Sequence, residues 1–406
     1  MFFTLYHSGV RRRKCREVIA VFAVLIALAW LAGSVGNLGL LGLGIALGIV
    51  FHYFSFGFAG FWRQAILERK TLGMRSHLLL LAVGGVLFFP TLALLPGLGY
   101  DVAGAIRPLG LNVLIGAFIF GIGMTLVGSC SSGTLRQMGA LNWRFYYVFL
   151  WMVIGGTLAA AQMDFWLELP TLGTFSAAVD VPWYLGLSAH LAVISVLYYF
   201  LLRWEQSESA RIEPLMNREA GWRSSPLVPA VLLLAVLNYL ILLVSQYPWA
   251  ISWIFPKLGI LGIQALSLPI DWEFWEFAAQ NEAGLSKSVL DDSIMLTSLG
   301  MVVGVSLAFW GQAFLKGAKA AEGREPKSFC GTCDRIKRLL FSALTGAMMG
   351  YGAVIAFGCN VGGFFSGIIS GSLHGWLWMF SALMGMSLTL FVSRWFRKPG
   401  VLSVRG

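Results

Sequence analysis

Two cysteines with matching surroundings are the residues best suited to chemistry in this 406-residue chain. Cys130 ends a run that begins at Gly121, and Cys359 ends a run that begins at Gly350; both read G-x-G, six residues, then Cys. A thiol is a weak hydrogen-bond donor and a soft partner for sulfur. Either motif alone is also typical of packing, since buried Cys acts as a small hydrophobe and Gly permits close helix contact. Recurrence at equivalent places favours a shared function.

Small and polar residues surround each thiol and are candidates for the same path. Ser131-Ser132-Gly133 follows the first cysteine, and Asn360-Val361-Gly362 follows the second. If helices resume at these residues, their exposed N–H groups favour an anion beside each thiol. The candidates from the two motifs are Gly123, Gly352, Ser131, Ser132 and Asn360.

A second kind of thiol chemistry is suggested by Cys330-Gly331-Thr332-Cys333. The nearby Arg335, Lys337 and Arg338 would lower the pKa of a thiol, so this CxxC pair could accept sulfur or exchange disulfides. The spacing also suits half a zinc site, but there is no second ligand pair, and no metal is expected. Two reduced thiols without a role remain a third interpretation.

Two charged or titratable residues are weaker candidates. His374 lies near the start of an apolar run, where it could face the entrance of a path and favour an anion when protonated. A hydrogen-bonded histidine at a helix start is the alternative. Arg63 follows the aromatic run 54–62 and could guide an anion, or it could simply flank an apolar segment.

The elements that must position these residues are membrane helices. Hydrophobic residues make up 58% of the chain, charged residues 12%, and mean hydropathy is +0.76. The apolar runs are long enough to span and lack the alternation of barrel strands. We expect ten spans, near 17–33, 39–59, 77–98, 112–130, 145–163, 184–203, 226–247, 293–314, 339–359 and 373–394. The stretch Ile251 to Ile270 is interrupted by prolines and is expected to be interfacial or re-entrant.

Charge placement predicts the orientation of these spans. With the N-terminus inside, 26 of the 29 Lys and Arg residues fall in cytoplasmic segments, and only Arg107, Lys257 and Lys287 fall outside. The acidic residues divide almost evenly. We therefore expect both termini in the cytoplasm and the chain in the inner membrane, with anionic lipids, not nucleic acid, facing the positive loops.

The two motifs also predict how the chain is organised. Their recurrence indicates homologous halves at 17–203 and 226–395, a cytoplasmic segment at 1–16, a linker at 204–225 and a tail at 396–406. By the span count, the first cysteine lies at the inner end of its helix and the second at the outer end, as in an inverted repeat. Gly and Ser around both indicate broken helices, which survive at membrane depth only where they line a cavity.

At these motifs the chain resembles the YeeE/YedE family of sulfur-transport membrane proteins, which includes thiosulfate-uptake permeases and relatives linked to selenium metabolism. The resemblance runs from about Gly42 to Arg394 and is most specific from Gly350 to Trp378. It implies re-entrant broken helices that line an hourglass-shaped path, where Cys130 and Cys359 contact the sulfur of a substrate. The family often has a further cysteine in an early F-C-F-like segment. The matching stretch here, residues 54–63, has none.

These observations favour a transporter over an enzyme: import of a small sulfur-containing anion, thiosulfate first and a selenium or other sulfur species next. A membrane thiol oxidoreductase or sulfurtransferase that uses the CxxC pair is an alternative, as is a structural subunit with dispensable cysteines. No phosphate-binding loop and no cofactor fingerprint occur, so no cofactor is expected. A cytoplasmic sulfur-carrier protein is a further partner that the CxxC pair suggests.

Overall fold

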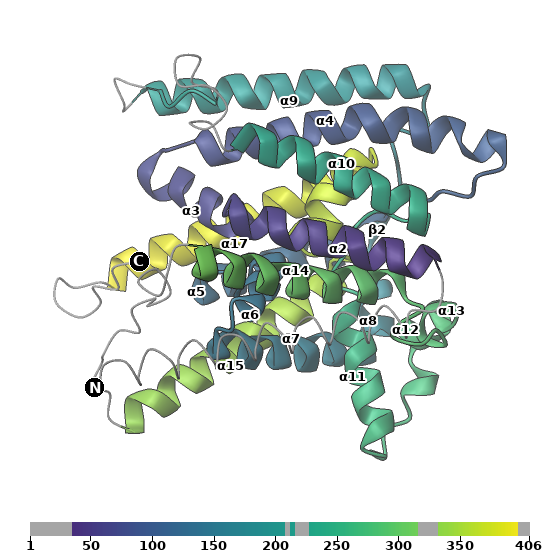
Figure 1. Ribbon diagram of the computed structural model, residues 1–406, viewed down its shortest axis with the longest axis vertical. Coiled ribbons are helices and arrows are strands. Elements are labelled where there is room, and N and C mark those ends of the chain that lie inside the picture. The colour runs from purple at the N-terminus through teal and green to yellow at the C-terminus, as the bar shows by residue number, and fades with distance from the viewer. Residues whose placement is uncertain (1–34, 208–211, 216–226, 316–331, 397–406) are drawn as a thin grey trace.

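The computed structural model describes residues 35–207, 212–215, 227–315 and 332–396 (Figure 1). Within these ranges, nine helices are long and apolar enough to cross a membrane. They agree with nine of the ten expected spans, and the expected span at 17–33 lies outside the described residues. The described chain is therefore an all-α polytopic membrane protein. The nine segments are Gly36–Glu68, Leu72–Leu94, Leu111–Gly139, Trp143–Ala161, Trp183–Gln206, Leu227–Ser245, Ser293–Gln312, Ile336–Ile355 and Leu373–Trp395.

The first half contains the helices up to residue 206. In chain order these are α2 (Val35–Tyr53), α3 (Phe58–Glu68), α4 (Leu72–Leu94), η1 (Pro96–Leu98), α5 (Leu111–Val127), α6 (Ser131–Gly139), α7 (Trp143–Ala161), α8 (Met163–Leu167) and α9 (Trp183–Gln206). Two short strands, β1 (Pro108–Gly110) and β2 (Thr171–Thr174), pair antiparallel.

The second half begins at residue 227. Its elements are α10 (Leu227–Ser245), α11 (Ile254–Ala265), η3 (Trp272–Phe274), α12 (Glu276–Gln280), α13 (Glu282–Leu285), α14 (Ser293–Leu315), α15 (Thr332–Ile355), the π-helical segment η5 (Asn360–Ser366), α16 (Gly367–Ile369) and α17 (Leu373–Phe396). The expected interfacial or re-entrant piece contains α11, which is too short to span.

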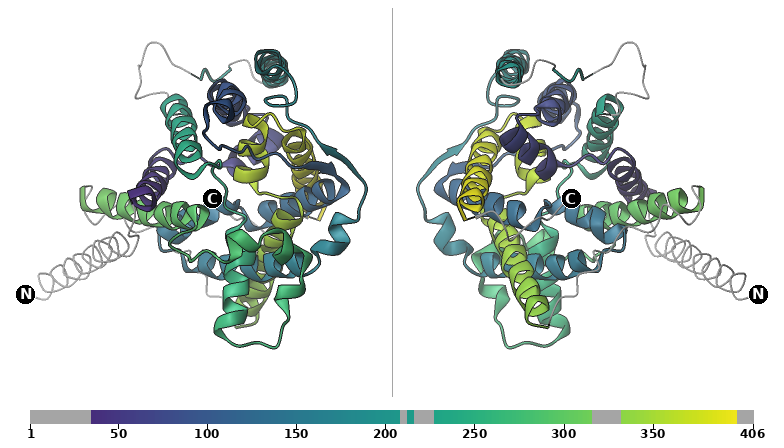
Figure 2. Two further views of the ribbon diagram at one scale, coloured as in Figure 1. Left: turned by 90° about the vertical axis from the view of Figure 1, so that its right-hand side faces the viewer. Right: turned by 90° about the vertical axis from the view of Figure 1, so that its left-hand side faces the viewer.

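The long helices run roughly across the page in Figure 1, and Figure 2 looks along them. Helix α9 lies at the edge and packs on α4, with Val196, Tyr199 and Phe200 exposed on its outer face. Apolar side chains that would be unfavourable in water suit a helix that faces lipid. At the centre, every residue from 358 to 372 is buried, so the irregular backbone after Cys359 is enclosed by protein.

Left-handed residues break two of the apolar segments in the described chain and lie just past the ends of two others. They are Ser55 (φ 49°), Gly128 (φ 79°), Gln246 (φ 62°) and Phe357 (φ 55°). The helical segments expected at 39–59 and 112–130 therefore bend at a break and continue as α3 and α6. Gly128 and Phe357 each lie two residues before a cysteine, so the same break occurs in both halves.

The two cysteine-bearing helices pack against each other in opposite directions. Gly116 of α5 approaches Ile355 of α15, and Gly123 further along α5 approaches Met349, earlier in α15. Each of these helices also packs along the long helix that comes after the other cysteine and its half-helix, α5 with α17 and α15 with α7. The same holds for the earlier helices of each half. Helix α2 corresponds in order to α10, and α4 to α14; α2 packs on α14, and α10 packs on α4. Antiparallel equivalent helices with exchanged partners are the packing expected of an inverted repeat.

Two ion pairs are buried in the described chain. Arg75 Nη2 of α4 lies 3.0 Å from Glu205 Oε2 of α9, and Lys257 Nζ of α11 lies 2.8 Å from Asp292 Oδ2. A charge inside a membrane protein needs a partner, because its desolvation is otherwise uncompensated. Both pairs join neighbouring elements.

Candidate functional site

Cys130 lies in the gap between α5 and α6. Gly128 ends α5 in the left-handed conformation, which glycine adopts without strain, and its N–H donates to the Met124 carbonyl at 3.0 Å. Cys130 is then extended (φ −91°, ψ −177°) and precedes the first residue of α6. Its side chain is 2% exposed, and its Sγ lies 3.3 Å from Ser132 Oγ. The chain turn thus places a buried thiol at the start of a half-helix.

Cys359 occupies the equivalent gap between α15 and η5. The Gly358 N–H donates to the Ala353 carbonyl at 2.8 Å, and a Cβ at Gly358 would lie 2.2 Å from the Gly363 nitrogen. Only glycine fits such a close backbone approach. Cys359 is fully buried and directly precedes the first residue of η5. The N–H groups of Val361 and Gly362 point at its sulfur.

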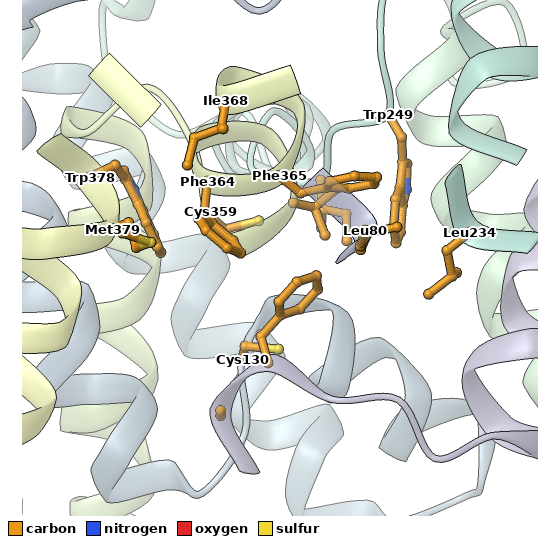
Figure 3. Close-up of a cluster of buried hydrophobic side chains, with 14 of the residues drawn as sticks. Leu80, Cys130, Leu234, Trp249, Cys359, Phe364, Phe365, Ile368, Trp378 and Met379 are labelled. Atoms are coloured by element: carbon orange, nitrogen blue, oxygen red, sulfur yellow. The ribbon is translucent and has the colours of Figure 1, made fainter. Parts of the chain in front are cut away.

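The two thiols lie in the same part of the interior. Cys359 faces Ser131 and Cys130, and Figure 3 shows both sulfurs within one cluster of buried side chains. Both cysteines are free. Each precedes a half-helix start, so unpaired N–H groups and helix dipoles from both halves favour negative charge in this region.

Buried polar groups without hydrogen-bond partners lie beside both thiols. Thr134 Oγ1 and both amide atoms of Asn360 have no partner within the part of the chain that the structure describes, and the Ser131 hydroxyl has only the Cys359 thiol beside it. These side chains are at most 1% exposed. Leaving a buried polar group unpaired costs roughly 1–3 kcal/mol. Ser131 and Asn360 are the first residues of the two half-helices, so a buried polar side chain with hydrogen-bonding capacity to spare follows each thiol.

A cavity of about 360 Å³ is lined by residues of α11, α12, α13 and the chain on either side of Cys359. We refer to it as the Arg107 cavity. Its lining includes Arg107, Lys287, Tyr247, Ser252, Phe357 and Gly362. Phe357 and Gly362 stand two residues before and three residues after Cys359 in the sequence, so the cavity wall includes the chain on both sides of that buried thiol.

The Arg107 cavity carries positive charge. Arg107 and Lys287 are exposed on its wall, and Arg107 Nη2 donates to Tyr247 Oη at 3.5 Å. The carboxylate in the lining, Asp292, is paired with Lys257 at 2.8 Å and accepts a bond from Trp253 Nε1 at 2.7 Å. A concave surface with excess cations attracts anions.

Sequence reasoning had not assigned these cations to a site. Arg107, Lys257 and Lys287 were the exceptions to the positive-inside pattern, and the structure places two of them on the cavity wall and the third in the ion pair beneath it. Their departure from the charge pattern was the signal that could have identified the cavity. A basic residue on the wrong side needs a reason other than topology.

Aromatic side chains pack around the thiols. Trp378 Nε1 donates to the Gly358 carbonyl at 2.8 Å, and the Trp378 ring lies 5.4 Å from that of Phe120. In the segment that lacks the family cysteine, Ser55 is exposed and Phe56 is buried, with the Phe56 ring 5.1 Å from His77. In this segment the buried side chain is therefore the aromatic ring of Phe56, which packs against His77.

The remaining predicted residues are Gly123, Gly352, His374 and Arg63, and the structure places them in three different surroundings. Gly123 and Gly352 lie in the contact between α5 and α15, where a Cβ at Gly352 would be 2.5 Å from the Gly116 carbonyl oxygen. His374 is buried, its Nδ1 is 2.8 Å from Ser372 Oγ, and it does not line the Arg107 cavity. Arg63 is exposed on α3 and is not brought to the thiols.

The CxxC pair is not part of this site as described. Cys330 lies outside the described residues, and Cys333 is in the first turn of α15 at a position whose side chain is not described. No group of three or more His, Cys, Asp or Glu residues suited to a metal occurs in the described ranges.

Comparisons with known proteins agree with a path for sulfur compounds. A family model described as Sulphur transport matches residues 55–388. The thiosulfate transporter TsuA of Spirochaeta thermophila is 24% identical over 357 residues, which cover 82% of this chain and 92% of that protein. The thiosulfate transporter TsuA of Escherichia coli is 24% identical over 356 residues, 84% of this chain and 90% of its own. The match includes both half-helices, both thiols and the Arg107 cavity, and this chain belongs to the Sulphur transport family.

Proposed function

We propose that this protein imports thiosulfate across the cytoplasmic membrane by way of the Arg107 cavity, Cys359 and Cys130. The observation that carries the proposal is the pair of facing thiols, each followed by a buried polar side chain with hydrogen-bonding capacity to spare. Two relatives named as thiosulfate transporters support the choice of anion.

The groups around the thiols suit both ends of thiosulfate. The sulfonate oxygens accept hydrogen bonds from Asn360 Nδ2, from the Ser131 hydroxyl and from N–H groups at the half-helix starts. The terminal sulfur is polarisable and contacts the thiols, which are weak donors. These neutral groups hold the anion loosely enough for it to move on, and the ion crosses unchanged.

Orientation follows from the distribution of charge. We place the Arg107 cavity outside and both termini in the cytoplasm of a cell with an inner membrane, and the repeats at 17–203 and 226–395 with a cytoplasmic linker at 204–225. Reporter fusions that are active only outside should stay inactive in the linker and at both termini. Activity at any of these places would reverse the orientation.

Uptake of labelled thiosulfate into cells that lack other sulfur importers tests the function. The wild type should accumulate label faster than cells without it, and sulfite and selenite should compete less well. Correctly inserted Cys130→Ser and Cys359→Ser variants should lose about tenfold in rate, because a hydroxyl is harder and bonds more strongly than a thiol. Cys15→Ser serves as the control. Normal uptake by both variants would reduce these cysteines to packing.

The same assay addresses the CxxC pair. We expect it to be auxiliary, because it occurs once and the thiols of the membrane path occur as a repeated pair. The Cys330→Ser, Cys333→Ser variant should retain at least partial uptake. Complete loss with normal insertion, or labelled sulfur attached to either cysteine, would support transfer of sulfur to these thiols and onward to a carrier protein.

A further inference from the structure

Helix α6 carries a cation that has no acidic partner among the described residues. Arg136 lies six residues after Cys130, in the last turn of α6, and is partly buried. It makes no hydrogen bond and no salt bridge with any described residue, whereas the buried Arg75 and Lys257 both have carboxylate partners. Arg136 belongs to a polar half-helix at the Gly139 end of its membrane segment, and its guanidinium donors are free for a ligand.

The surroundings of Arg136 are titratable but contain no acid. Six residues correspond to about 9 Å along a helix, and a long side chain can fold back over that distance toward the helix start. Arg136 interacts electrostatically with Cys130 and with His52 in the last turn of α2, and His52 contacts Gln312 near the end of α14. No described Asp or Glu contributes to the field at Arg136.

The same half-helix presents two buried hydroxyl groups. Ser131 and Thr134 are 1% and 0% exposed; Thr134 Oγ1 has no partner in the described chain, and the Ser131 hydroxyl has only the Cys359 thiol beside it. Along α6 from Cys130, the hydroxyl groups of Ser131 and Thr134 come first and the guanidinium of Arg136 comes next. Such a series of donors suits an anion that moves away from the thiol.

A purely structural role explains the neighbouring Arg144 but not Arg136. Arg144 Nη2 donates to the Val127 carbonyl at 3.5 Å, at the end of α5, and its Nε donates to Ser342 Oγ at 3.4 Å. Such contacts close a helix C-terminus. The repeat gives a second comparison, because Phe365 occupies the position in η5 that corresponds to Arg136. A half-helix of this kind forms without a cation there.

We propose that Arg136 forms a second anion-binding position, on the side of Cys130 away from the Arg107 cavity, from which a sulfur-containing anion leaves the path. This inference rests on the proposed function and locates its release step. A guanidinium can bind two sulfonate oxygens at once, and Lys cannot reproduce that geometry. Because Arg136 is only partly buried, water competes for the anion and permits release.

Purified protein in vesicles of known orientation separates the two ends of the path. Arg136→Gln should lower the maximal rate of labelled thiosulfate uptake about tenfold and change half-saturation at the Arg107 side less than about twofold. In vesicles that present the α6 end, its half-saturation concentration should rise about tenfold. Arg136→Lys should give about a threefold rise, since charge is kept and the two-point contact is lost. Arg203→Gln, an exposed cation on α9, is the matched control.

The outcomes distinguish this inference from the function on which it rests. Wild-type vesicles without thiosulfate flux would overturn the proposed function itself, and this inference with it. Flux in the wild type with unchanged half-saturation at the α6 end in Arg136→Gln would overturn only the role of Arg136. If Arg136→Gln does not reconstitute, Arg136→Lys decides, and wild-type values in that variant would refute the proposal.

Discussion

Asn360, the residue after Cys359, is a buried side chain whose hydrogen-bonding groups do not stabilise the fold. Asn360 is fully buried and neither its amide nitrogen nor its carbonyl oxygen has a partner in the described ranges. Asn238 is equally buried, but its Nδ2 donates to Ser366 Oγ at 3.4 Å and its Oδ1 accepts from the Trp249 N–H at 2.8 Å. The same side chain thus occurs once with its bonds made and once without them.

We expect Asn360→Leu and Asn238→Leu to behave in opposite ways. Asn360→Leu removes two unpaired groups, so the free energy of unfolding should stay the same or rise by about 1 kcal/mol, while thiosulfate uptake falls at least about tenfold. Asn238→Leu leaves its partners unpaired and should lower stability by about 2 kcal/mol. Thermal unfolding in detergent and uptake in cells measure the two effects. A destabilised Asn360→Leu variant would show that the amide serves the fold.

At the scale of elements, the breaks in the helices decide where the thiols lie. Gly128 and Phe357 adopt the same left-handed conformation two residues before their cysteines. Glycine takes this conformation freely, whereas for other residues it costs roughly 1–2 kcal/mol. The second half therefore tolerates strain at Phe357, a residue that also lines the Arg107 cavity.

The break at Gly128 can be tested without steric side effects, because a Cβ there would meet nothing within 4 Å. Gly128→Ala should lower the free energy of unfolding by about 1 kcal/mol through backbone strain alone. It should also slow uptake by shifting α6 relative to Cys130. Gly97→Ala, equally open and without a positive φ, is the control and should match the wild type. Equal melting temperatures for the two variants would mean that the chain relieves the left-handed turn cheaply.

The sequence predicted those structural features that depend on one segment of the chain alone. Span length and apolarity depend on single segments, and the described spans agree with the expected ones. Gly and Ser around each cysteine also indicated broken helices, which the structure shows. The break at Ser55 was not expected, because its Phe-rich surroundings are as apolar as any helix. The Arg107 cavity was not expected either, since its lining comes from segments far apart in the chain and only tertiary packing brings them together.

The whole molecule combines a symmetric centre with unlike ends. The half-helices and thiols occur at matching places in both parts of the chain, but the cations at the two ends do not. Loops supply Arg107 and Lys287 at one end, whereas α6 itself supplies Arg136 at the other. Because the two thiols and half-helix starts are alike, we expect direction-dependent properties such as capture and release to come mainly from the unlike cations at the two ends.

Capture at the Arg107 cavity is the last prediction and depends on the field of the whole entrance. Replacing both Arg107 and Lys287 by Gln removes two exposed cations from the wall and leaves the paired Lys257 and Asp292 in place. Half-saturation for thiosulfate should rise about five- to tenfold at low ionic strength, with little change in maximal rate, because the thiols and half-helices are untouched.

Ionic strength distinguishes this effect from a change in shape. Added salt screens exposed charges over about 10 Å at 0.1 M, so the difference between variant and wild type should shrink as an inert salt is raised. Lys70→Gln, which removes an exposed cation that is paired with Glu68 and does not line the cavity, should leave half-saturation unchanged at every salt concentration. A defect in the double variant that persists undiminished at high salt would point instead to lost hydrogen bonds, such as that from Arg107 to Tyr247, and would mean that the cavity recognises its anion by contact and not by its field.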